Sequence, residues 1–141
     1  MSDPLYSHAL DWSTISVGDV LPALVIDMSA TRIVAGAIAS RDFMPVHHDR
    51  DFANQQGAPD IFMNILSTNG FVGRFITDWA GPDAILKSVK IRLGAPNHPG
   101  DTMTMTGQVT AKDDGVIEVH VRGANEIGDH VTGTVALELP R

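Results

Sequence analysis

Side chains able to move protons are concentrated in residues 41–50, RDFMPVHHDR. Asp42 and His47 stand on either side of Pro45, which restricts the backbone and allows both side chains to enter one pocket if the segment turns. A carboxylate and an imidazole that share one water molecule can remove a proton from it and deliver a proton to a neighbouring atom. The segment therefore predicts acid–base chemistry, although a solvated polar loop would have the same composition.

Addition of water to an α,β-unsaturated thioester would use such a pair, and it also needs a hydrogen-bond donor for the enolate oxygen. Backbone N–H groups around Met63 and Asn64 are candidates, because these residues lie near the start of a predicted helix and helix N-termini stabilise negative charge. The Asn64 side chain is a further candidate. Lys87 and Arg92 belong either to a solvated strand edge or to a contact with the phosphates of coenzyme A.

A metal site is the main chemical alternative for His47-His48-Asp49. Side chains of adjacent histidines diverge on most backbones, and no other histidine-rich stretch completes a ligand set, so we expect no metal. The other histidines stand singly and are expected to be surface or hydrogen-bonded residues: His8, His98, His120 and His130.

Length and composition limit the architecture and the classes of partner. The 141 residues are 43% hydrophobic, which predicts one compact domain over 1–141, with a polar arm over 1–16. The formal charge of −7 argues against a sequence-independent nucleic-acid binder, and the absence of cysteine excludes disulfides and thiolate metal sites. Neither a signal peptide nor a membrane-spanning stretch is evident, so we expect a soluble cytoplasmic protein.

The first half of the chain mixes strand and helix patterns. Two apolar runs, 20–28 and 32–39, predict strands, although the alanines of the second would also tolerate a helix. Residues 42–49 predict a loop, followed by a short helix that Asp49 caps and that ends at Gly57. Asp60 is then the expected N-cap of a long, largely buried helix, which Gly81-Pro82 ends.

The second half predicts four strands. The segment 85–93 has one apolar face, and the segments 103–111, 117–122 and 131–139 alternate apolar with polar residues. Turn residues at 113–115 and 126–129 make the last three an antiparallel meander. The pattern alone thus predicts an α+β domain in which a curved antiparallel sheet wraps around one apolar helix.

Several motifs resemble the MaoC-like hydratases, and together they span nearly the whole chain. Residues 42–49 resemble the family signature Asp-x-Asn-Pro-x-His-x-Asp, and Val17-Gly18-Asp19, Pro96 and Gly100-Asp101 are similar to other family positions. A narrower resemblance is to the small subunit of heteromeric hydratases of steroid side-chain enoyl-CoA thioesters. It rests on these blocks: 41–43, 46–51, 60–62, 64–66, 77–82 and 128–132.

This resemblance implies a hot-dog fold and a 2-enoyl-CoA hydratase in which Asp42 and His47 are catalytic, Asp49 shapes the loop, and coenzyme A enters only as part of the substrate. It also implies pairing with a second MaoC-like chain, as a homodimer or a heterotetramer. Met44 replaces the usual asparagine, and Met63-Asn64 replaces a common His-Gly pair, so both changes alter the expected pocket for a bulky acyl group.

Two other functions fit the same fold. An acyl-CoA thioesterase would also bind coenzyme A, but its acidic residue would activate water against a carbonyl carbon. A non-catalytic subunit would only complete the pocket of a partner. We favour the hydratase, because a purely structural role leaves the Asp42 and His47 pair unexplained.

Overall fold

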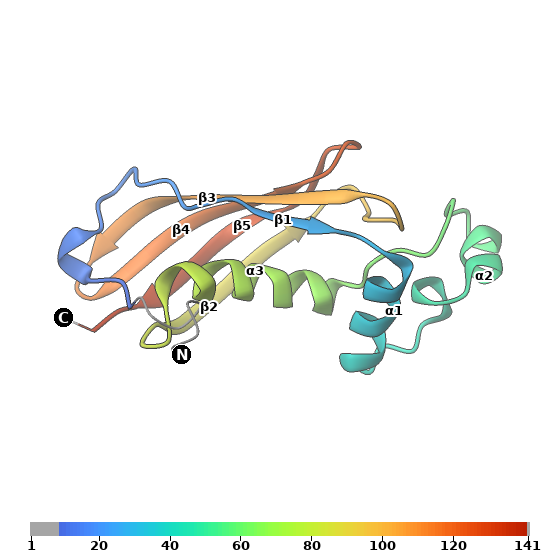
Figure 1. Ribbon diagram of the computed structural model, residues 1–141, viewed down its shortest axis with the longest axis horizontal. Helices are drawn as coiled ribbons and strands as arrows, with labels where there is room; N and C mark the ends of the chain where they lie inside the picture. Colours follow the sequence, from blue (N-terminus) through green and yellow to red (C-terminus); the bar gives the residue numbers. More distant parts are fainter. Residues whose placement is uncertain (1–8, 141) are drawn as a thin grey trace, which may run out of the picture.

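The computed structural model describes residues 9–140, which form one sheet and three α-helices (Figure 1). The elements are, in chain order, β1 (Leu24–Asp27), α1 (Ala30–Ala39), α2 (Arg50–Gln55), α3 (Ile65–Ala80), β2 (Ile85–Leu93), β3 (Thr102–Asp113), β4 (Val116–Ala124) and β5 (Asp129–Glu138). Short 3₁₀ turns occupy Trp12–Thr14 and Pro45–His47. The helix α3 runs along one face of the sheet, and α1 and α2 gather near its N-terminal end (Figure 1).

The sheet is antiparallel throughout, with strand order β1-β3-β4-β5-β2. The predicted meander of β3, β4 and β5 is confirmed. Its first turn requires positive φ angles, which are 48° at Asp114 and 84° at Gly115, and Asp and Gly are the residue types that adopt them readily. Strands β1 and β2 are the two edges, and β2 pairs along its length with β5 only.

The core lies between α3 and the sheet. Val72, Phe75 and Ile76 on α3 are at most 2% exposed, and each such burial stabilises the fold by about 1.5–3 kcal/mol. Gly107 on β3 allows Phe75 to approach, because a Cβ at this position would lie 2.9 Å from Cε1 of the ring. Gly81 ends the helix with φ 85°, as predicted. This sheet wrapped around one buried helix is the hot-dog fold.

Two predicted elements were wrong. The segment 32–39 is helical, within α1, because Ser29 caps its first turn and the buried residues Ile33 and Ala37 are four apart, which is a helical period. The long helix begins at Ile65 instead of following Asp60. The Met63 N–H donates to the Asn97 carbonyl, which holds the preceding residues in a non-helical segment.

The expected N-terminal arm lies partly outside the described residues, since the structure describes it from residue 9 onward. Ile15 is buried, and the Lys112 ammonium donates hydrogen bonds to the carbonyls of Trp12 and Ile15. This part of the arm thus packs on its own sheet. Within residues 9–140, no helix combines the length and apolarity needed to cross a bilayer.

Candidate active site

The end of α1 turns the chain so that Asp42 faces His47. Arg41 has a left-handed φ of 58°, and the Asp42 N–H bonds back to the Ala37 carbonyl at 2.9 Å. The 3₁₀ turn that begins at Pro45 then returns the chain and presents His47. The two side chains converge, with 3.3 Å between His47 Nε2 and Asp42 Oδ2.

The imidazole of His47 is oriented from its other side. Its Nδ1 lies 2.7 Å from the Phe62 carbonyl oxygen, which can only accept, so Nδ1 carries a proton and donates it. The Phe62 ring also packs edge-on against the imidazole at 5.1 Å. His47 is 8% exposed, so ring rotation is restricted, and Nε2 is the nitrogen left to exchange protons beside Asp42.

Asn64 connects this pair to the start of α3. Its Oδ1 accepts the Ser67 N–H at 3.1 Å, which makes it the helix N-cap. Its Nδ2 donates to Asp42 Oδ2 at 3.0 Å and to Ser40 Oγ at 2.8 Å. The bond from Asn64 is the largest cause that lowers the pKa of Asp42; burial opposes it, and the Met44 N–H and His47 add to it. Asp42 is therefore held as a carboxylate.

The geometry changes the set of candidate enolate donors. Both amide protons of Asn64 and the N–H of Met63 are already hydrogen-bonded, which does not support the expectation that either supplies the free donor. The Ser67 N–H is also engaged. Within the described chain, the first helical N–H groups without an acceptor are those of Ile65 and Leu66, as expected for an N-terminus.

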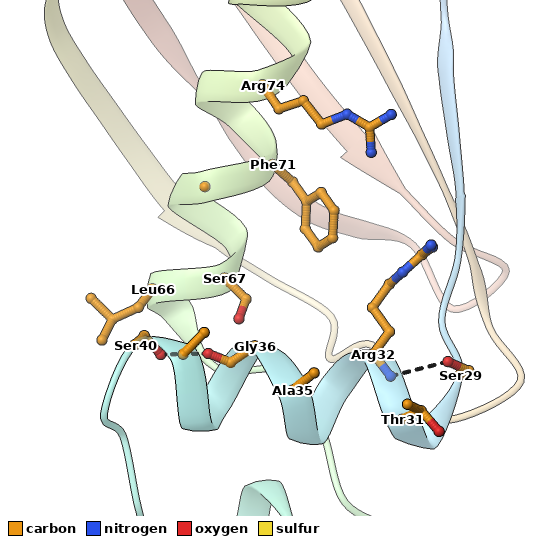
Figure 2. Close-up of a pocket in the computed structure, with 12 residues that line it drawn as sticks. Ser29, Thr31, Arg32, Ala35, Gly36, Ser40, Leu66, Ser67, Phe71 and Arg74 are labelled. Atoms are coloured by element: carbon orange, nitrogen blue, oxygen red, sulfur yellow. Dashed lines mark hydrogen bonds between the residues drawn. The ribbon is translucent and has the colours of Figure 1, made fainter.

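A groove of about 770 Å³ lies between α1 and α3, beside the Asp42 and His47 pair. Ser40 belongs both to its lining and to the hydrogen bonds of Asn64, so the groove starts one side chain away from Asp42. Its walls are mainly apolar and backbone surface from Ala35, Gly36, Ala39, Leu66, Gly70 and Phe71. Figure 2 shows Arg32 and Arg74 on the side of Phe71, away from Ser40.

The remaining predicted site residues lie elsewhere. Asp49 is exposed and caps α2 by accepting the Phe52 N–H, so the structure gives it a role in shaping the loop. Met63 is 5% exposed and belongs to the core. Lys87 pairs with Glu138 at 3.2 Å, and Arg92 is exposed on the same edge strand. Among the described residues, no hydrogen bond or ion pair joins any of these four to the side chains of Asp42 and His47.

Three contributors to the site were missed by sequence reasoning. Ser40 directly follows the segment 32–39, which was interpreted as a strand, and recognition of the Ser29 cap would have placed Ser40 at a helix end. The Phe62 carbonyl is a backbone group with no residue signature. Thr68, in the first turn of α3, bonds to the single histidine His130.

His98 and His130 are hydrogen-bonded as expected. Residues 9–140 contain no group of three His, Asp or Glu side chains able to hold a metal.

The fold and the site define a class: a hot-dog domain with an acid–base pair beside the N-terminus of its central helix. Residues 17–130 match the family model of the MaoC-like domain, and the chain belongs to this family. It is 54% identical, over 123 residues, to the beta subunit of 3-oxo-4,17-pregnadiene-20-carboxyl-CoA hydratase of Mycobacterium tuberculosis, covering 87% of this chain and 95% of that one.

Solved structures agree with this family. A chain of the ChsH1-ChsH2 complex from Mycobacterium tuberculosis superimposes with a TM-score of 0.88 at 54% identity, covering 89% of this chain and 98% of that chain. The (R)-hydratase of A. caviae involved in PHA biosynthesis gives a TM-score of 0.82 at 24% identity, covering 90% and 98%. At that identity the second match supports the fold alone.

Proposed function

We propose that this chain is the catalytic subunit of a 2-enoyl-CoA hydratase, which adds water to the double bond of an α,β-unsaturated acyl-CoA and yields a 3-hydroxyacyl-CoA. The observation that carries the proposal is the 3.3 Å approach of His47 Nε2 to Asp42 Oδ2, with each side chain oriented by its own partner. The 54% identical hydratase subunit supports the same reaction.

In the proposed reaction, a water molecule beside the pair donates hydrogen bonds to both the Asp42 carboxylate and His47 Nε2. Neutral His47 accepts a proton from it at Nε2 while the oxygen attacks the β-carbon, and Asp42 orients the water and stabilises the imidazolium. The electron pair of the double bond moves onto the thioester oxygen, where the Ile65 and Leu66 N–H groups receive the enolate charge. The imidazolium then returns the proton to the α-carbon, which regenerates the enzyme without a metal or redox cofactor.

A large, mainly apolar acyl group is the proposed substrate. Its support is the groove between α1 and α3, which has room for several rings and begins at Ser40, beside the reacting groups. The relative that acts on 3-oxo-4,17-pregnadiene-20-carboxyl-CoA points to a steroid-derived acyl chain. Because acyl-CoA thioesters are made and used inside cells, the cytoplasm is the proposed location.

We propose that a second MaoC-like subunit completes the enzyme. A similar chain belongs to the ChsH1-ChsH2 complex, and the edge strand β2 exposes Ile85, Leu86 and Leu93, which are 59, 37 and 42% exposed. Apolar side chains on an open sheet edge are suited to pairing with another chain. Lys87 and Arg92 remain candidates for contacts with the phosphates of coenzyme A from the same strand.

The deciding experiment uses the complex co-purified from the native host. Loss of the absorbance of the conjugated thioester should accompany formation of the 3-hydroxyacyl-CoA, with steroid-like enoyl-CoA preferred to a four-carbon one. A saturated acyl-CoA should release no free thiol. Thiol release without hydration would support the thioesterase instead, and hydration that survives the loss of both Asp42 and His47 would assign this chain a non-catalytic role.

Gly70 provides a test of where the acyl group binds. It lies in the middle of α3, where glycine costs about 1 kcal/mol relative to alanine, and a Cβ added there meets nothing within 4 Å. Gly70→Leu should therefore fold well and fill part of the groove. We expect kcat/KM for a steroid-like enoyl-CoA to fall at least about tenfold, within the range for a blocked apolar pocket, with the four-carbon substrate little affected.

Thr77→Leu is the matched control, because it adds a leucine to an exposed position of α3 that does not line the groove. It should leave both substrates unaffected. Equal losses for large and small substrates in Gly70→Leu would contradict the placement. Loss of the partner subunit on size-exclusion chromatography would instead identify the groove as part of the subunit interface.

A further inference from the structure

A buried histidine outside the acid–base pair is linked to it through α3. His130, the second residue of β5, is 3% exposed. Its Nδ1 lies 2.7 Å from the Ala95 carbonyl, and its Nε2 lies 2.9 Å from the hydroxyl of Thr68, which is fully buried in the first turns of α3. Both ring nitrogens thus have partners, and the hydrogen bonds join β5 and the loop after β2 to the helix.

The protons in the series of hydrogen bonds from Ala95 through His130 to Thr68 have defined positions. The Ala95 carbonyl can only accept, so Nδ1 donates to it. Burial lowers the pKa of His130, against the opposing effect of the Ala95 bond, so the ring is neutral and Nε2 is an acceptor. The Thr68 hydroxyl must then donate to Nε2, and its proton is directed away from the Asn64 carbonyl, which lies 3.3 Å away.

The direction of the Thr68 hydroxyl proton affects the hydrogen bonds of Asn64. Its carbonyl accepts the Thr68 N–H at 3.2 Å, which is the first backbone hydrogen bond of α3, while its side chain caps the helix and holds Asp42. A Thr68 hydroxyl without its partner at His130 would turn to the Asn64 carbonyl and compete with that bond. The hydrogen bond to His130 prevents this competition and also ties the first turn of α3 to β5. Through both effects it holds Asn64, the residue that orients Asp42.

We propose that His130 is a positioning residue for the hydration reaction, acting through Thr68 and Asn64 to fix the Asp42 carboxylate beside His47. This inference rests on the proposed function. His130 touches neither the water nor the substrate in the proposed reaction. Its effect is geometric, because it restricts movement of the N-terminus of α3, where Asn64 donates to Asp42.

Two matched pairs of variants separate the hydrogen bonds from the packing. Thr68→Val keeps the shape of the side chain but removes the hydroxyl, whereas Thr68→Ser keeps the hydroxyl. His130→Gln places an amide oxygen near the position of Nε2 and keeps an acceptor for Thr68, whereas His130→Asn keeps a donor near Nδ1 only. Thr68→Val and His130→Asn break the hydrogen bond between positions 68 and 130.

With the assembled complex, we expect Thr68→Val and His130→Asn to lower kcat about tenfold, as a small misplacement of a catalytic group does, with little change in KM. Because Asn64 then holds Asp42 less firmly, the pKa of Asp42, measured by NMR titration of its carboxyl group, should rise. Thr68→Ser and His130→Gln should restore both properties to near the wild-type values.

Ile117→Val on β4 is the control for stability alone, since it removes one buried methyl group. It should lower the melting temperature without changing kcat or the pKa of Asp42. The proposal is overturned if Thr68→Val, which preserves shape and should fold, behaves like Ile117→Val, or if Thr68→Ser fails to rescue. A wild-type complex without hydratase activity would instead refute the proposed function.

Discussion

Asp42→Asn should lower kcat by about 100- to 10,000-fold, because the variant cannot hold the charge that orients water and stabilises the protonated imidazole. His47→Asn should cost as much: its amide can still donate to the Phe62 carbonyl in place of Nδ1, but nothing replaces Nε2. Since both groups act on one water molecule, the double variant should lose little more than the worse single variant. Single-turnover hydration of an enoyl-CoA measures these losses.

The adjacent histidine supplies the matched control. His48 is exposed, and its imidazole Nε2 lies 3.3 Å from the Phe43 carbonyl oxygen, so His48→Ala should keep nearly full activity. Circular dichroism and melting temperature should show that all these variants fold. Substantial turnover in both Asp42→Asn and His47→Asn would remove the basis for the proposed mechanism.

Asn64 should keep the pKa of Asp42 low. Asn64→Ser preserves a good N-cap but removes the donor that is the largest cause of the lowered pKa of Asp42. That pKa should rise, and NMR titration of the Asp42 carboxyl group measures the change directly. Asn64→Asp also keeps a cap but places a second carboxylate beside Asp42. It should raise the pKa of Asp42 further and lower kcat at pH 7 about 100-fold, as expected when catalytic geometry is disturbed.

The change in the pKa of Asp42 should also alter how the free energy of unfolding depends on pH. A carboxyl group with a lowered pKa in the folded state stabilises the fold above its unfolded pKa, and this contribution disappears as the pH falls through the folded pKa. The stability difference between wild type and Asn64→Ser should therefore shrink in acid. A titration curve of Asp42 in Asn64→Ser that overlays the wild-type curve would show that the amide does not control Asp42.

The parts of the fold with a regular apolar period could be predicted from the sequence. Strands β3, β4 and β5 alternate cleanly, and the Asp114-Gly115 turn requires residues of those types, so both the strands and their pairing followed. The segment 32–39 lacks a regular apolar period that would distinguish strand from helix. Its small and apolar residues suit either structure, and the Ser29 cap together with packing of Ile33 against the core decides for the helix.

The same distinction applies to the site. Asp42 and His47 are close in sequence and share one loop, so their meeting was predictable, and the structure confirms it. Their supports are not local: the partner of His47 is a backbone carbonyl 15 residues away, and Thr68 lies 62 residues from His130. A single sequence carries no signal for such pairs, because hydrogen bonds between distant segments depend on the finished tertiary structure.

The open edge of β2 also bears on how the protein must be produced. A strand with free backbone donors and acceptors and three exposed aliphatic side chains will accept another strand from any source, including a second molecule of the same chain. Synthesis of this chain in excess over the proposed partner would thus favour misassembly and precipitation. Balanced expression with that proposed partner, and early encounter with it, would protect this edge while the chains are still newly made.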